Sequence, residues 1–152
     1  ARGLTYWAAE GGGAWCRGPA GERRLQVNPV GDLSLALVAT GFGYTRRRRE
    51  AQAPLIAGLL PQVRDLRRMG AAALDLCMVA SGAVDAHIEH GLSPWDWAAG
   101  GLIAAEAGAR VILPPAQSRG ADGHPTIAVA PGIADAFLAA LDGLGGLGKL
   151  PN

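Results

Sequence analysis

The 152-residue sequence predicts an α/β fold, with a mostly parallel or mixed sheet, helices on both of its faces, and a short hairpin before it. From residue 33 onward, short apolar runs alternate with longer segments that favour helices, and the loops between them are short. Residues 35–39 are apolar throughout, as expected of a strand that is covered on both faces. Before them, residues 4–9 and 14–16 flank a Gly-Gly-Gly turn and can pair as a hairpin. A two-stranded hairpin is marginal alone, so we expect it to join a larger antiparallel sheet.

The predicted strands are short runs of apolar, aromatic or β-branched residues bounded by Gly, Pro or Asn. They are expected at residues 4–9, 14–16, 25–27, 35–39, 63–67, 84–88, 111–113 and 125–130. The strand at 84–88 runs into Glu89, and Asp96 follows close to the start of the next predicted helix. Open α/β sheets place their ligands at this junction of strand end and helix start.

The predicted helices lie at residues 46–60, 71–80, 95–107 and 133–141. Pro54 does not fit the interior of the first helix, so we expect that helix to start late or to break there. In the second helix, Leu74, Cys77 and Met78 are expected to share one apolar face. The Gly-rich tail after Asp142 is expected to fray.

Composition argues against several classes of protein. The chain is 49% hydrophobic and 18% charged, which allows a sizeable core and argues against disorder. Its net charge of +1 provides no global field for nucleic acid or an anionic membrane, and no apolar run approaches the length of a membrane span. Cys16 and Cys77 lie far apart and form no disulfide framework, so a reducing, cytoplasmic compartment is expected.

Two acidic residues each allow two interpretations. Ser93, Pro94 and Asp96 form a capping-box-like start to a helix, in which Asp96 complements the helix dipole. Alternatively, Asp96 is a ligand of a hard cation such as Mg²⁺, which would require further carboxylates from elsewhere. Glu89 is either a solvated strand end or a hydrogen-bond acceptor for a substrate hydroxyl, which would suit a polyol.

Other polar clusters are weaker candidates. His87 and His90 are three residues apart on a predicted strand and therefore point to opposite faces, so they do not predict a zinc site. The basic run at residues 46–49 is interpreted as a solvated loop and helix start, because the run is short and the chain is almost neutral. Phosphate or nucleic-acid binding is the rival interpretation of that run.

A long motif at residues 95–108, W-D-W-A-A-G-G-L-I-A-A-E-A-G, resembles the C-terminal motif of the inositol monophosphatase family. Residues 70–73, 85–91 and 11–14 resemble further segments of the same family, so the resemblance covers nearly the whole chain. It implies a Mg²⁺-dependent phosphomonoesterase with an αβαβα layered fold, of which this chain is the C-terminal part. It also implies a homodimer.

The resemblance implies a role for five residues. Asp96 would be catalytic as a ligand of Mg²⁺, and Glu89 would bind a hydroxyl of a small phosphorylated polyol or sugar. The backbone at Gly70, Ala71 and Ala72 would line the same substrate pocket. Ala71 stands where the family usually has a hydroxyl residue, which loosens the expected contact with the substrate.

Half of the family's catalytic residues do not occur in residues 1–152. The D-P-[IL]-D-G-T motif and the paired acids upstream of it, which supply most metal ligands, are absent from this sequence. We therefore expect residues 1–32 to be a hairpin remnant of the missing N-terminal domain's sheet, and residues 33–152 to be the C-terminal α/β domain. Alone, the chain should be inactive, because one carboxylate cannot assemble a two-metal site.

Several alternatives remain for the function. Relatives with the same C-terminal motif act on histidinol phosphate, fructose 1,6-bisphosphate or adenosine 3′,5′-bisphosphate. A non-catalytic binding or interaction module that keeps the family fold is a further alternative.

Overall fold

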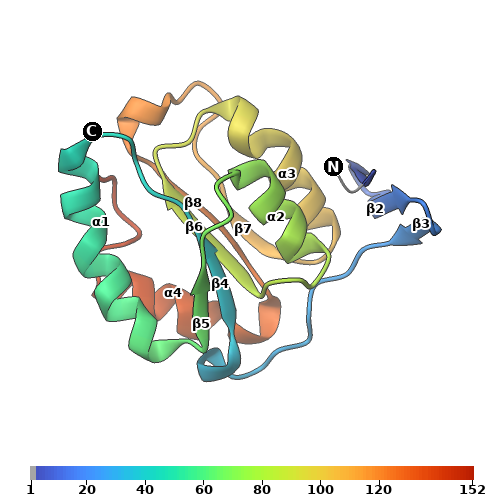
Figure 1. Cartoon of the computed structure of the whole chain (residues 1–152), viewed down its shortest axis with the longest axis horizontal. Coiled ribbons are helices and arrows are strands. Elements are labelled where there is room, and N and C mark those ends of the chain that lie inside the picture. Colours follow the sequence, from blue (N-terminus) through green and yellow to red (C-terminus); the bar gives the residue numbers. More distant parts are fainter. Residues whose placement is uncertain (1–2) are drawn as a thin grey trace.

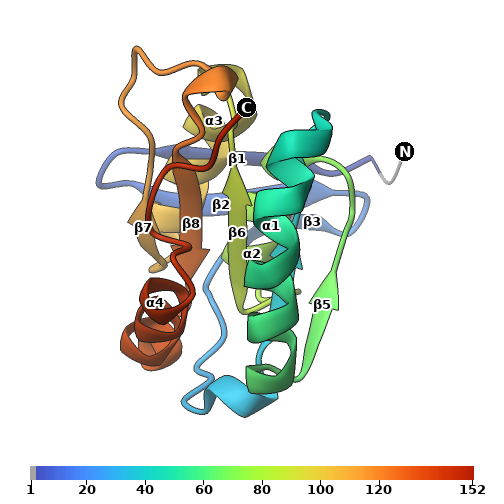
Figure 2. The same ribbon diagram turned by 90° about the vertical axis from the view of Figure 1, so that its left-hand side faces the viewer.

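Four layers of secondary structure are seen in residues 3–152, the part of the chain that the computed structural model describes (Figure 1). Residues 1 and 2, at the start of the predicted hairpin region, lie outside the described residues. Two helices, α1 and α4, cover one face of a five-stranded sheet, and α2 and α3 cover its other face (Figures 1 and 2). A three-stranded sheet packs on the outer side of α3. The predicted α/β fold class is confirmed.

The five-stranded sheet has the order β5-β4-β6-β8-β7. Its strands are β4 Leu37–Thr40, β5 Asp65–Arg67, β6 Ala86–His90, β7 Arg110–Ile112 and β8 Pro125–Val129. The β4–β5 and β4–β6 pairs are parallel, whereas β8 is antiparallel to both of its neighbours. The sheet is therefore mixed, and only β8 runs against the other strands.

The three-stranded sheet is antiparallel and consists of β1 Thr5–Ala9, β2 Gly13–Gly18 and β3 Gly21–Arg24. The predicted hairpin corresponds to β1 and β2, but the strand expected at 25–27 is wrong. The N–H of Leu25 donates to the carbonyl of Ala14 in β2, whereas the N–H of Val27 donates to the carbonyl of Ala107 at the end of α3. These residues bond to two different elements, so they form a connection rather than a strand.

The four α-helices are α1 Arg46–Leu59, α2 Ala72–Ala80, α3 Pro94–Glu106 and α4 Ala134–Gly143. No helix of the described residues is long and apolar enough to cross a membrane. Helix α1 continues through Pro54, contrary to expectation. Gln52, Leu55 and Leu59 bury one face of α1 on both sides of the proline, and this packing offsets the hydrogen bond that proline cannot donate.

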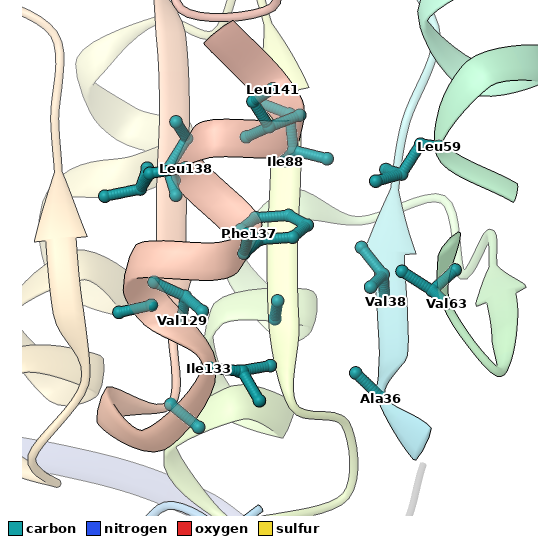
Figure 3. Packing of buried hydrophobic residues seen from close by; sticks show 14 of the residues in the cluster. Ala36, Val38, Leu59, Val63, Ile88, Val129, Ile133, Phe137, Leu138 and Leu141 are labelled. Atoms are coloured by element: carbon teal, nitrogen blue, oxygen red, sulfur yellow. The ribbon is translucent and has the colours of Figure 1, made fainter. Parts of the chain in front are cut away.

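Three apolar clusters hold the layers together. The largest lies between the five-stranded sheet and helices α1 and α4, with Phe137 fully buried at its centre (Figure 3). The second lies under α2 and α3, and the third joins these helices to the three-stranded sheet. Helix α2 contributes to the second and third clusters, so it buries more than one stripe of residues. Cys77 is buried as predicted, but Leu74 is 56% exposed and does not share its face.

The Gly-rich tail after Asp142 is tied to the body of the protein rather than frayed. The N–H of Leu150 donates to the carbonyl of Gly123 at 2.9 Å. Nε2 of His90 donates to the carbonyl of Gly146, also at 2.9 Å. The expectation of fraying was wrong because it considered only composition, whereas these partners lie far away in the sequence.

A buried carboxylate, Asp85, joins the segments at the foot of the sheet. One oxygen accepts from the N–H of Leu37 at 2.7 Å, and the other accepts from the side-chain amide of Asn28 at 2.9 Å. The backbone N–H of Asp85 donates to the Leu37 carbonyl, and its own carbonyl accepts from the N–H of Ala130. Asp85 therefore connects the starts of β4 and β6, the end of β8 and the chain that enters from the small sheet.

We predict that Asp85→Ala lowers the free energy of unfolding by about 3 kcal/mol, because the Leu37 N–H and the Asn28 amide lose their acceptor inside the protein. Urea denaturation of the 152-residue chain measures this change. The matched control is Asp142→Ala, at an exposed position of α4, which should change the free energy by less than about 0.5 kcal/mol. Equal effects of the two substitutions would contradict the role assigned to Asp85.

Candidate functional site

A cavity of about 490 Å³ lies at the carboxyl ends of β4 and β6. These strand ends point to the upper side of the molecule in Figure 1. Helices α1, α2 and α3 all begin at this cavity, and residues from each helix start line it. All five residues predicted from the sequence lie in its wall: Gly70, Ala71, Ala72, Glu89 and Asp96. The structure thus brings the predicted residues together, while their roles stay predictions.

Asp96 is half-buried in the first turn of α3, where it both caps the helix and faces the cavity. Its Oδ2 accepts from the backbone N–H of Ser93 at 3.0 Å. The Ser93 hydroxyl accepts from the N–H of Gly120 at 3.1 Å, which fixes the loop that carries the cap. Oδ1 of Asp96 accepts no hydrogen bond from the described residues, so it is free to bind a ligand. The capping and ligand interpretations are therefore compatible.

The donor set of the cavity fits a magnesium ion only in part. Mg²⁺ prefers carboxylate oxygen, and Asp96 can supply one such ligand. Among residues 3–152, however, no group of three or more His, Cys, Asp or Glu side chains gathers closely enough to hold a metal ion. A complete metal centre at this cavity would need donors from outside the described residues.

Glu89 lies inside β6, one residue before the strand ends, rather than after the strand as predicted. Its carboxyl packs against Gly41, and a Cβ atom at that position would displace the carboxyl. Burial, together with the nearby Asp75 and Asp96 carboxylates, raises the pKa of Glu89 to about 7, against the opposing charge of Arg68. Near neutral pH, this carboxyl can therefore accept a hydrogen bond from a hydroxyl group when it is ionised, or donate one to it when it is protonated.

The segment from Gly70 to Ala72 turns the chain into α2. Gly70 has φ +90, a conformation that favours glycine, and a Cβ there would also meet the guanidinium of Arg68. Ala71 is the N-cap residue and has no side chain that can cap the helix. The first backbone N–H groups of α2 are therefore available at the cavity.

Arg48 is a cavity residue that the sequence interpretation missed. It was expected to be solvated with the rest of the 46–49 run, but it is only 3% exposed. Its guanidinium donates to the carbonyls of Gly120, Pro151 and Ala121 at 2.7, 3.0 and 3.2 Å. Burial lowers the pKa of Arg48. The available signal was its spacing from Gln52, Leu55 and Leu59, which places it on the buried face of α1.

The two histidines beside Glu89 lie on opposite faces of β6, as predicted. His87 faces α2, with Nδ1 at 4.0 Å from Oδ2 of Asp75. His90 faces the C-terminal tail and bonds to Gly146. They cannot bind one metal ion together.

The sequence and structure of this chain are similar to those of several known proteins. Residues 1–142 match the sequence profile of the inositol monophosphatase family. The inositol-1-monophosphatase SuhB of Mycobacterium tuberculosis is 54% identical over 148 residues, which cover 97% of this chain and 51% of that protein. The inositol-1-monophosphatase of Mycobacterium leprae is 52% identical over 148 residues, with the same shares covered. The solved structure of M. tuberculosis SuhB superposes with a TM-score of 0.87 at 53% identity, covering 95% of this chain and 56% of that one. The chain spans about half the length of the curated relatives it matches.

We predict that Glu89→Gln stabilises the chain in a pH-dependent way. Folded Glu89 holds its proton up to about pH 7, whereas the unfolded side chain releases it near 4.5. The stability that the raised pKa contributes is therefore complete below about pH 4.5 and is lost as the pH rises through about 7. The free energy of unfolding of Glu89→Gln should exceed that of the wild type by up to about 3 kcal/mol at the upper end of this range.

Urea denaturation at a series of pH values measures this difference. The matched control is Glu50→Gln, at an exposed position of α1 outside the cavity. A difference for Glu89→Gln that does not change with pH would contradict burial of the carboxyl.

Proposed function

This chain belongs to the inositol monophosphatase family, and we propose that it supplies the substrate-binding half of a Mg²⁺-dependent phosphomonoesterase. The observation that carries this proposal is the convergence of the family's motif residues. Residues 70–72, Glu89 and Asp96 come from three separate segments, and all of them line one cavity at the carboxyl ends of parallel strands.

Each of these groups has a distinct role in the proposed reaction. Asp96 offers its free Oδ1 as one ligand of Mg²⁺ while Oδ2 stays bonded to the helix start. Glu89 binds a hydroxyl of the sugar-like part of the substrate. The turn at Gly70 and the free N–H groups of α2 close the same wall of the cavity. Bound metal ions would supply activation of a water for in-line attack on phosphorus and stabilisation of charge on the leaving oxygen.

The remaining ligands would come from an N-terminal half, because the chain spans only 51% of its relatives. In this proposal residues 1–32 complete the larger sheet of that half, and residues 33–152 form the C-terminal domain. Large apolar side chains that such a half would cover are exposed here. Trp7 is 40% exposed and stacks on Trp15 on the outer face of the small sheet, and Trp95 is 75% exposed at the rim of the cavity.

The substrate in this proposal is a small phosphorylated polyol or sugar, because Glu89 suits a hydroxyl-rich group. Two of the similar proteins are named inositol-1-monophosphatases, which makes an inositol phosphate the first compound to test. Histidinol phosphate, fructose 1,6-bisphosphate and adenosine 3′,5′-bisphosphate belong in the same substrate panel. A non-catalytic module with the family fold would turn over none of them.

We predict that Asp96→Asn, in the full-length protein that contains this chain, lowers Mg²⁺-dependent kcat/KM for the best phosphate ester by about 100-fold or more. An amide is a poorer ligand for Mg²⁺ but can still accept the Ser93 N–H, so the fold should be spared. Phosphate release measures the effect, and Asp142→Asn, outside the cavity, should leave it unchanged. Activity that survives Asp96→Asn at the wild-type level would refute the assigned ligand.

A further inference from the structure

A polar pair with no hydrogen-bond partner is buried beneath the cavity. Asp75, in the first turn of α2, is 1% exposed, and His87, on β6, is 0% exposed. Their nearest polar atoms, Oδ2 and Nδ1, are 4.0 Å apart. Neither oxygen of Asp75 and neither ring nitrogen of His87 has a hydrogen-bond partner among the described residues. Buried polar groups are nearly always paired, so this pair calls for an explanation.

His87 lies two residues before Glu89 on β6, and Asp75 faces His87 from α2. Side chains alternate along a strand, so His87 and Glu89 point to the same face of β6, the face that packs on α2. Thr126 of β8 is paired in register with Glu89, and its buried hydroxyl also has no partner among the described residues. A row of polar groups therefore leads from the interior, through Asp75 and His87, to the floor of the cavity at Glu89.

We propose that Asp75 and His87 are positioning residues for Glu89, and that the charge held by this pair decides whether the Glu89 carboxyl donates or accepts the hydrogen bond to a substrate hydroxyl. The role of Glu89 in binding a hydroxyl rests on the proposed function. The coupling between the pair and Glu89 does not, because it depends only on the fold.

The charged groups around Glu89 come from the helices and from the segment before α2, not from the neighbouring strands. Asp75 of α2 and Asp96 of α3 are acidic. Arg68, just before α2, and Arg48 of α1 are basic and line the same cavity. The neighbour on β8, Thr126, is neutral. Among these, Asp75 is the acidic group with the larger effect on Glu89, and it is the one that His87 can control.

The ionisation of the pair supports this assignment. Burial raises the pKa of Asp75 to about 6, against the opposing charge of Arg68, and burial lowers the pKa of His87 to about 4. Above about pH 6, the pair is therefore a carboxylate beside a neutral imidazole. The imidazole has one N–H that can stabilise the carboxylate, directly after a small shift or through one bridging water. The carboxylate in turn favours the protonated form of Glu89.

The test is a ¹³C NMR titration of the Glu89 side-chain carboxyl in the 152-residue chain, from about pH 4 to about pH 9. Asp75→Asn removes the negative charge, so the Glu89 midpoint should fall by about one pH unit. His87→Leu should also lower the Glu89 midpoint, because Asp75 then has no hydrogen-bond donor beside it and stays protonated to higher pH. His87→Gln, which keeps an N–H donor, should restore the wild-type midpoint, and Asp142→Asn should not change it.

A Glu89 midpoint that is unchanged in Asp75→Asn would overturn the proposal. If the variants fail to fold, the wild-type curve decides. Coupled groups titrate together, so the Glu89 signal should show a second inflection at the midpoint of Asp75, and a single-step curve would count against the coupling.

In the full-length protein, Asp75→Asn should move the pH profile of KM to lower pH by the same shift, while Asp142→Asn should leave the profile in place. A full-length protein without phosphatase activity contradicts the proposed function alone, since the NMR result stands without it. An active protein whose KM profile does not move contradicts the positioning role.

Discussion

The hydrogen bonds of the Asp85 carboxylate are the interaction on which the geometry of the cavity depends. They hold the foot of β6 against β4 and fix the register of the two strands. Four residues further along β6, Glu89 reaches the upper end of the sheet, beside Gly41, which directly follows β4. A shift of one residue in this register would turn Glu89 to the opposite face, away from α2 and the cavity. A buried carboxylate at one end of the strand thus sets the position of the carboxyl group at the other.

The cavity combines groups whose charges are held in different ways. Arg48 is fixed by backbone carbonyls, so its position does not depend on any acidic partner among the described residues. Asp96 is fixed by the start of α3, and Glu89 by its place within a strand between two others. These supports leave the functional atoms free while the side chains stay in place, which is what a site requires if it is to bind a metal ion and a substrate.

Local sequence patterns were sufficient to predict the order of strands and helices after residue 33, and the family resemblance led to five of the residues that line the cavity. They failed where the deciding partner lies far away in the sequence. Pro54 stays within a helix because of packing across the core, and the tail is held by Gly123 and His90. Arg48 looked like its exposed neighbours, because burial of one member of a charged run depends on carbonyls about 70 to 100 residues away. The Asp75–His87 pair was missed because no sequence pattern links the two residues, and only the fold brings them together.

In the proposed function, this chain carries the substrate-binding wall and a single metal ligand of a site whose other ligands come from an N-terminal half. Release of inorganic phosphate from an inositol phosphate in the presence of Mg²⁺, measured for the 152-residue chain and for the full-length protein at equal concentration, tests it most directly. We expect turnover by the full-length protein and none by the chain alone, since Asp96 cannot hold a two-metal centre by itself. Mg²⁺-dependent turnover by the purified chain at the rate of the full-length protein would contradict the account.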